Sequence, residues 1–513
     1  MEKRVLLAAI ISALFMAWYA RLVGKWYPQA SPTTQTIPGA AETPAAMSAK
    51  PVTTYPLEQE DVLSLESPDL AVEVGASSGM IRGVSLKRFS GQSEGHPLEI
   101  STGAALVHLS FAQSPMGWRL IEHSAGRLRF NASDAKGNNY NISYVIDSDN
   151  PIINIILEQV SGEQNDITLS SSWTRGDTLD QRKNPLEVSV LSKDSHGKEI
   201  HKRYLGHVRQ ERNVPRGTFL LSLAERYFCQ SIRFKTADAD VKLIPSSEGS
   251  IVAEAVMKSA ATTQTITQEL SIYFGPRDYF HLKRAGFEQA FPIGTLGQIG
   301  LIMLSLLSWI AKLTKSYGIA IILFASLITC AMAPFTLIGF KSMRKMQELK
   351  PQIDRIMAQH KGNTTIANRE VFALYKQHRI SPLSGCLPML LQMPIFIALF
   401  QAISHFVELR GQRFLWIKDL SLPDRLSQLP IALPLLGKDL NLLPIIMAVA
   451  MYIQTKLSQG RSGQSTQDPT AKMFSGPMMS VLFGVMFYQF PSGLVLYWLT
   501  NSLMSLVWYR LAK

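Results

Sequence analysis

The sequence is poor in cysteine and in charge. Its three cysteines, Cys229, Cys330 and Cys386, lie too far apart for the paired-thiol spacing of a zinc site or a redox motif. A disulfide scaffold is therefore excluded, and we expect all three to be small buried hydrophobic side chains. Charged residues make up 18% of the 513 residues, below the roughly 25% of ordinary globular domains. Hydrophobic residues reach 46%, which excludes a disordered chain.

Acidic residues are scarce outside the middle of the chain. Residues 55–285 contain 28 of the 39 Asp and Glu and 25 of the 51 Lys and Arg, so this stretch is nearly neutral. The remainder carries 26 basic and 11 acidic residues. Positive charge that flanks apolar segments is typical of the cytoplasmic side of a membrane protein. Nucleic-acid binding is the alternative explanation of the basicity, but we expect no nucleic-acid target.

The N-terminal residues predict a membrane anchor over residues 1–27. Residues 5–20 are uncharged, and Arg21, Lys25 and the aromatic residues at 18, 19, 26 and 27 lie at their end, as at a membrane interface. A cleaved signal peptide is the alternative. Residues 28–55, which are rich in Pro, Ala, Thr and Ser, predict a disordered linker.

Residues 56–285 predict a large β-sandwich domain. Short runs of alternating apolar and polar residues are separated by turn signals. The histidines of this region follow no metal-ligand spacing, so we expect no metal site and no cofactor. The clearest strand predictions are residues 70–74, 106–111, 127–130, 140–146 and 152–158.

The rest of the chain predicts apolar helices. Residues 286–316 predict an amphipathic helix at the membrane interface, because the apolar run is short and Trp309 lies close to lysines. Residues 473–513 predict two spans, since Phe490 to Gly493 should interrupt a helix. Spans of about 18 residues are only about 27 Å long, which favours a locally thinned bilayer. The predicted spans are the N-terminal anchor, 317–340, 381–406, 441–456 and the two within 473–513.

Loop charges predict the orientation of these spans. Residues 341–380 carry nine basic and three acidic residues, so they should be cytoplasmic. The loop 407–440 has little bias and should lie outside, whereas the loop 457–472 should be cytoplasmic. This gives six spans with both termini inside and the β domain outside. Apolar residues at helical spacing predict a helical hairpin in 341–380, with a basic contact face for a ribosome or a nascent chain made by Arg344, Lys345, Lys350, Arg355, Lys376 and Arg379.

Two long motifs resemble the YidC, Oxa and Alb family of membrane insertases. They are SPLSGCLP at residues 381–388 with LQMPIFIAL at 391–399, and FPSGLVLYW at 490–498. Shorter matches lie at residues 345–353, at VELR (407–410) and at YFGP (273–276). The resemblance to the bacterial members covers nearly the whole chain and is weakest from residue 28 to about 270.

The resemblance implies a multi-pass protein of the bacterial inner membrane that is not an enzyme. Five spans would partly enclose a hydrophilic groove, open to the cytoplasm and to lipid, which accepts nascent transmembrane segments and releases them into the bilayer. The periplasmic domain would be similar to a sugar-mutarotase-type sandwich. The implied partners are nascent inner-membrane proteins, the Sec translocon, the ribosome (transiently) and membrane lipids.

Polar residues inside the apolar spans are the candidates for the lining of this groove, although each could equally make a helix-packing hydrogen bond. Thr329 stands where the family usually carries an arginine, and residues 317–340 contain no Lys or Arg. We therefore hypothesise a hydrated but neutral groove. The candidates are Ser326, Thr329, Gln392, Gln454, Thr455, Gln489, Tyr497, Trp498, Thr500 and Asn501.

A multi-pass solute transporter or channel is the main alternative function. Such a protein would show charged residues within its spans or an inverted repeat with broken helices. The sequence shows neither feature.

Overall fold

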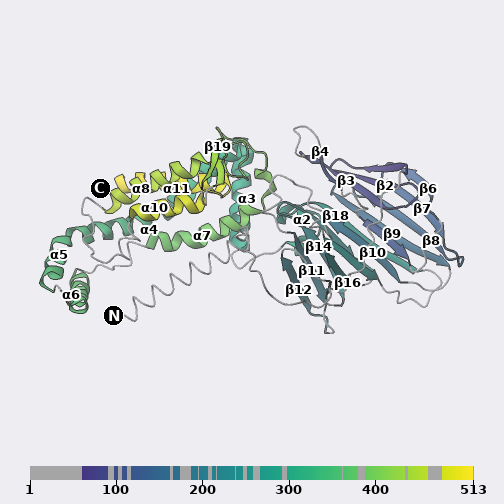
Figure 1. Ribbon diagram of the computed structural model, residues 1–513, viewed down its shortest axis with the longest axis horizontal. Helices are drawn as coiled ribbons and strands as arrows, with labels where there is room; N and C mark the ends of the chain where they lie inside the picture. The colour runs from purple at the N-terminus through teal and green to yellow at the C-terminus, as the bar shows by residue number, and fades with distance from the viewer. Residues whose placement is uncertain are drawn as a thin grey trace, which may run out of the picture. The chain divides into compact units, whose positions relative to one another are not determined.

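The computed structural model describes residues 60–511 with gaps, of which the longer are 174–185, 258–265, 379–386 and 460–475. The predicted anchor and linker lie outside the described residues, as do Arg379 and Cys386. The chain forms two compact units, and the boundary between them falls at Pro292 and Ile293. Each unit is described by itself below (Figure 1).

The first unit is a β-sandwich-type domain of antiparallel strands. One series of paired strands runs β6–β7–β8–β9–β18–β15–β14–β11–β12. A second series runs β1–β2–β3–β5–β10–β17–β16–β13, with β4 also on β3. The pair Thr218 and Ala239 joins the two series. The strands are β1 (Val62–Glu66), β2 (Leu70–Gly75), β3 (Ile81–Ser90), β4 (Pro97–Ser101), β5 (Val107–Phe111), β6 (Arg119–Ser124), β7 (Arg127–Ser133), β8 (Asn139–Ile146), β9 (Ile152–Ser161), β10 (Ile167–Trp173), β11 (Glu187–Lys193), β12 (Glu199–Leu205), β13 (Arg212–Asn213), β14 (Thr218–Ala224), β15 (Phe228–Phe234), β16 (Ala239–Pro245), β17 (Ile251–Met257) and β18 (Ile266–Pro276).

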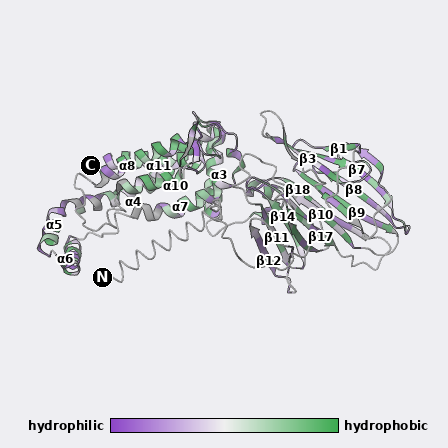
Figure 2. Cartoon of the chain, viewed as in Figure 1, coloured by the Kyte–Doolittle hydropathy of each residue, from purple (hydrophilic) through white to green (hydrophobic). Residues whose placement is uncertain are grey.

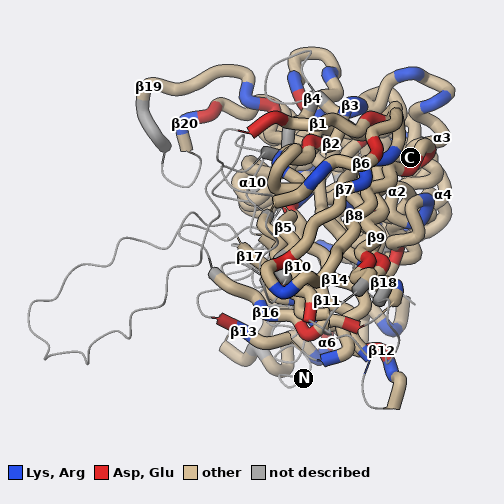
Figure 3. Tube along the Cα trace, turned by 90° about the vertical axis from the view of Figure 1, so that its right-hand side faces the viewer, with Lys and Arg blue, Asp and Glu red and all other residues tan. Residues whose placement is uncertain are grey.

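Alternation of side chains places one face of each strand in the core. In β7, Leu128, Phe130 and Ala132 are buried while the residues between them reach the surface. All five strand predictions are confirmed as β2, β5, β7, β8 and β9. Lys and Arg as well as Asp and Glu are scattered over the strands of this domain (Figure 3), which agrees with its near-neutral composition.

A short helical segment follows β18 and covers one face of the domain. Helix α2 (Tyr279–Arg284) begins after Asp278, whose carboxylate accepts hydrogen bonds from the backbone of Phe280 and His281. The 3-10 helix η2 (Glu288–Ala290) comes next. Leu282 and the residues around η2 pack against Cys229, which is fully buried as predicted. Burial raises the pKa of the Cys229 thiol to about 12, so this cysteine is unreactive.

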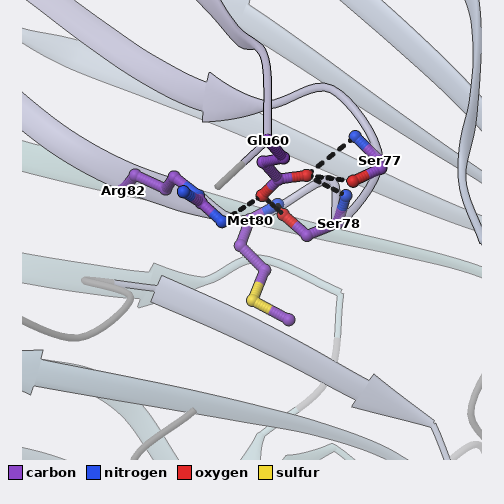
Figure 4. A network of polar contacts seen from close by, with 5 residues as sticks. All are labelled: Glu60, Ser77, Ser78, Met80 and Arg82. Carbon is purple, nitrogen blue, oxygen red and sulfur yellow. Dashed lines mark hydrogen bonds and ion pairs between the residues drawn. The ribbon is translucent and has the colours of Figure 1, made fainter. Parts of the chain in front are cut away.

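Glu60, just before β1, binds the turn between β2 and β3. Its carboxylate accepts hydrogen bonds from the backbone and hydroxyl groups of Ser77 and Ser78 and lies 2.5 Å from the Arg82 guanidinium (Figure 4). Burial alone would raise the pKa of Glu60. The hydrogen bonds from the two serines outweigh it and lower the pKa to about 2.

Replacing Glu60 with Gln is expected to destabilise the β domain by about 1–2 kcal/mol, because a neutral amide cannot accept this set of bonds as well as a carboxylate. The pKa of Glu60 is lower in the folded than in the unfolded chain. Its contribution is therefore present above the unfolded value and is lost as the pH falls toward about 2. Thermal unfolding of the Glu60→Gln variant at pH 7 and pH 3 measures the loss of stability. Asp61→Asn is the control, since Asp61 is exposed. Equal effects of the two variants at pH 7 would contradict the assignment.

The second unit is a set of helices with one small hairpin of strands, β19 (Ser427–Leu433) and β20 (Gly437–Leu440). Hydrophobic residues dominate several of these helices (Figure 2). Among the described residues, two helical stretches are long and apolar enough to cross a membrane, Gly297–Thr314 and Tyr317–Met346. The helices are α3 (Gly297–Thr314), α4 (Tyr317–Glu348), α5 (Lys350–Gln359), α6 (Thr364–Gln377), α7 (Leu387–Ser404), η3 (Val407–Leu409), α8 (Leu442–Gln459), α10 (Gly476–Phe487) and α11 (Ser492–Leu511).

Several helix boundaries differ from the sequence-based expectation. Helix α4 passes through Pro334 and continues beyond Phe340 to Glu348, so the apolar segment and the start of the predicted hairpin form one helix. The predicted interruption near Phe490 is confirmed, since α10 ends at Phe487 and α11 begins at Ser492. The described part of α10 has 12 residues, and α11 has 20, close to the predicted 18.

The prediction that Cys330 is buried is wrong, because this residue is exposed on α4. The helical period places it on the same face as Leu323, Leu327 and Ile338, which are also exposed. An apolar position in a helix therefore did not imply burial within the protein.

Candidate functional site

Helix α11 is the centre of the helical unit. Residues 492–500 are all buried, and α11 packs against α4, α7 and α8. Two polar side chains on one face, Tyr497 and Asn501, lie one turn apart. The Tyr497 hydroxyl accepts a hydrogen bond from Gln392 Nε2 of α7 at 2.7 Å, and Asn501 Oδ1 lies 2.9 Å from Thr329 Oγ1 of α4. We call Thr329, Gln392, Tyr497 and Asn501 the polar cluster.

Two side-chain hydrogen bonds link the polar cluster, and none of its members is charged. Tyr497 and Thr329 are buried, whereas Gln392 and Asn501 are partly exposed. The Thr329 hydroxyl also lies 2.7 Å from the Ala325 carbonyl. Because a hydroxyl has one proton, Thr329 donates either to Ala325 or to Asn501, and the amide of Asn501 can turn to donate in its place. The hydrogen bond between Thr329 and Asn501 can thus be given up while the Thr329 hydroxyl keeps the Ala325 carbonyl as its acceptor.

Three of the other predicted groove residues make hydrogen bonds within their own helices. The hydroxyls of Ser326, Thr455 and Thr500 donate to the carbonyl four residues earlier in their own helices, at 2.8, 2.7 and 2.8 Å. Such bonds satisfy a hydroxyl without a partner helix. Gln489 is exposed in the turn before α11, and Gln454 is partly exposed on α8.

Trp498 belongs to an aromatic cluster and not to the polar one. Its ring centroid lies 5.1 Å from that of Phe396, 5.6 Å from Phe483 and 5.2 Å from Phe487. These contacts join α7, α10 and α11 beside the polar cluster, with centroid separations typical of favourable aromatic pairs. This aromatic cluster was not predicted from the sequence, although Phe483 and Phe487 are four residues apart and therefore share a helix face.

The segment between α7 and α8 holds the N-terminal end of α11. The Ser492 amide and hydroxyl donate to the Leu422 carbonyl at 2.8 and 2.6 Å, and the Gly493 amide donates to the Leu420 carbonyl at 2.9 Å. A Cβ at residue 493 would lie 3.2 Å from the Leu420 oxygen, so a glycine suits this close approach. The Pro-Ser-Gly motif thus positions the helix that carries Tyr497 and Asn501.

The helical unit is similar to known membrane proteins. Residues 309–511 match the family model described as 60Kd inner membrane protein. This region of the chain is therefore similar to the 60Kd inner membrane protein family. The matched residues include every member of the polar cluster and of the aromatic cluster.

Curated relatives of the chain are named membrane protein insertase YidC. The relative from Endomicrobium trichonymphae is 37% identical over 288 residues, which cover 55% of this chain and 53% of that protein. The relative from Geobacter sp. strain M21 is 34% identical over 292 residues, covering 56% and 51%. The chain thus spans about half the length of the curated relatives it matches. Their shared name describes membrane protein insertion and not an enzymatic reaction.

Two solved structures were also found to be similar. The crystal structure of an active YidC insertase with its first transmembrane domain resolved is 18% identical and has a TM-score of 0.39, covering 89% of this chain and 94% of that one. A galactose mutarotase-like protein from Lactobacillus casei is 7% identical with a TM-score of 0.31, covering 42% and 100%.

The described members of the predicted basic contact face are distributed over three helices, α4, α5 and α6. Arg344 lies near the end of α4, 3.9 Å from Glu348. Lys350 and Arg355 are five residues apart on α5, which places them about 140° apart around the helix. They do not share a face. Lys376 is exposed on α6, where the prediction overlooked Arg369, an exposed residue one turn from Phe372 and two turns from Lys376.

Proposed function

We propose that this chain is a membrane protein insertase of the bacterial inner membrane. It accepts nascent transmembrane segments in a hydrophilic groove that opens to the cytoplasm and releases them into the bilayer, alone or with the Sec translocon. The observation that carries the proposal is the polar cluster around α11, within the region that matches the family.

The polar cluster supplies what an entering segment needs. Polar groups of a client cost several kilocalories per mole each if they are left without partners in hydrocarbon. Gln392 and Asn501 are partly exposed, and each has an amide that can exchange its present partner for a client group. Burial of the client's apolar helix in lipid, on the order of 25 cal/mol per Å², then drives release without a cofactor.

The proposed topology has six spans, with the β domain in the periplasm and both termini in the cytoplasm. Loop charges support this orientation, because residues 341–380 carry nine basic and three acidic side chains. The exposed apolar stripe on α4, which includes Leu323 and Leu327, is the face that would contact lipid. Spans of about 18 residues, as the sequence predicts, would favour local thinning of the bilayer.

The experiment that tests the function is depletion of the protein in cells, followed by protease mapping of small inner-membrane proteins. We expect their periplasmic segments to stay on the cytoplasmic side after depletion. The ribosome and the Sec translocon are tested in the same cells by co-purification during client synthesis. Clients that still reach their normal topology would favour a transporter or channel.

Neutrality of the groove gives a separate prediction. Thr329 occupies the position of the expected family arginine, so charge pairing with acidic client segments should be absent. Photo-crosslinking from the Ser326 position, which is partly exposed on α4, should capture clients with and without acidic outer tails to a similar extent, while Thr329→Arg should favour the acidic tails several-fold. A strong preference for acidic tails in the unmodified chain, abolished by Thr329→Val, would contradict neutrality.

A further inference from the structure

Helix α6 has two faces of different character. Ala367 is buried and Val371 and Leu374 are partly buried on the face that packs on α5. The opposite face consists of exposed residues at helical spacing, and we call it the outer face of α6. Its members are Thr365, Ile366, Arg369, Phe372, Ala373 and Lys376.

The outer face of α6 combines exposed apolar groups with positive charge. Ile366 is 44% exposed and Phe372 is 48% exposed, and Arg369 and Lys376 lie between and beside them. The acidic residue of this helix, Glu370, lies to one side, where its carboxylate is 3.1 Å from His360 at the end of α5. The outer face therefore carries basic residues without an acidic one.

The chain keeps α6 close to the apolar helices. Helix α5 begins two residues after α4 ends, and nine residues separate the end of α6 at Gln377 from the start of α7 at Leu387. A segment of that length spans at most about 30–36 Å. If α4 and α7 lie in a bilayer, as the proposed function requires, α6 stays within reach of its surface.

We propose that the outer face of α6 lies on the membrane surface and binds anionic lipid headgroups. Arg369 and Lys376 would contact the headgroup phosphates, while Ile366 and Phe372 enter the boundary between headgroups and acyl chains. This combination of Lys or Arg with aromatic and aliphatic residues on one face is that of an interfacial helix, and the cytoplasmic leaflet has a negative surface potential.

Ribosomal RNA is the competing partner for a basic helix near the membrane. Its phosphates would pair with Arg369 and Lys376, and a base could stack on Phe372. The aliphatic side chain of Ile366 gains little from such a partner. A lipid surface satisfies all four side chains, so the arrangement favours lipid.

The test uses the full chain in vesicles of phosphatidylcholine with or without about one third phosphatidylglycerol, an anionic content chosen to give a clear surface potential. A nitroxide label is placed by Ala373→Cys on the outer face or by Asn368→Cys, an exposed position off this face, after the three native cysteines are replaced. In the anionic vesicles, the ratio of oxygen to nickel-chelate accessibility should be several-fold higher at residue 373 than at residue 368. Replacing both Arg369 and Lys376 with Gln should remove most of this difference, and so should Phe372→Ser.

Two results would overturn the proposal. One is a label at residue 373 that is as accessible to the nickel chelate as the label at residue 368 in both kinds of vesicle. The other is protection of residue 373 only when ribosomes are added, which would assign the face to the ribosome. A label at Leu327, on α4, reports separately whether the helices enter the bilayer at all, so a failure of the proposed function is distinguishable from a failure of this inference.

Discussion

Replacing Arg277 with Met is expected to lower the free energy of unfolding of the β domain by about 3 kcal/mol, the lower end of the usual cost of breaking a buried ion pair. Arg277 and Glu187 are each about 4% exposed, and their side chains approach to 2.7 Å. Arg277 also donates to the Glu225 carbonyl at 3.0 Å. The substitution therefore removes one of the two arginines that donate to the buried Glu187 carboxylate, leaving Arg203 at 2.6 Å, and removes the Arg277 bond to the Glu225 carbonyl.

The pH dependence of stability gives an independent signature of the same pair. Burial alone would raise the pKa of Glu187, but Arg277 and Arg203 outweigh it and lower the pKa to about 2. The pKa is thus lower in the folded chain than in the unfolded one. The stabilisation is complete above the unfolded value and is lost as the pH falls toward about 2. In Glu187→Gln this acid-dependent loss should be smaller.

Denaturant unfolding of the full chain in detergent, followed by the β-sheet circular dichroism signal, measures these effects. Arg88→Met is the matched control, because Arg88 is largely exposed and lies 4.0 Å from Asp69, and exposed pairs contribute at most about 1 kcal/mol. The double variant Arg277→Met with Glu187→Leu should recover part of the loss, since no buried carboxylate remains and the Arg203 side chain, which is 30% exposed, can reach water. If Arg277→Met cost no more than Arg88→Met, the buried pair would not be what holds this part of the domain together.

Local sequence patterns predicted the strands well because alternation is a local signal. The five clearest strand predictions correspond to β2, β5, β7, β8 and β9, where one face is buried in the core. The same patterns could not predict which strands pair. The partnership of β9 with β18, for example, joins residues more than a hundred positions apart. The buried pair of Glu187 and Arg277 depends on such long-range pairing and leaves no signature in the neighbouring sequence.

The candidate site was predicted in part. The criterion of a polar residue within an apolar helix selected Thr329, Gln392, Tyr497 and Asn501, which the structure brings together. The same criterion also selected Thr500, whose hydroxyl is satisfied by its own helix. A rule based on residue type cannot separate these cases, because the difference lies in where each side chain points around its helix axis. Cys330 was misjudged for the same reason.

Replacing Asn501 with Leu is expected to reduce client insertion about tenfold or more, corresponding to about 1.4 kcal/mol of lost stabilisation for one polar partner of the entering segment. The fold should survive this change, because Thr329 retains its bond to the Ala325 carbonyl and so no buried hydroxyl is left unpaired. Gln392→Met should act in the same direction. Protease protection of a small inner-membrane client, in cells depleted of the unmodified protein, measures insertion.

Thr500→Val is the matched control for Asn501→Leu, since the two residues are neighbours on α11 but the Thr500 hydroxyl bonds only within its helix in the described contacts. A packing role for Asn501 predicts a different outcome. An interhelical hydrogen bond in a membrane averages about 0.6 kcal/mol, so its loss would lower thermal stability slightly and leave insertion unchanged. Normal insertion by Asn501→Leu, with or without such a stability loss, would show that the polar cluster holds helices together and does not receive clients. The groove would then have to be sought along another face of α11.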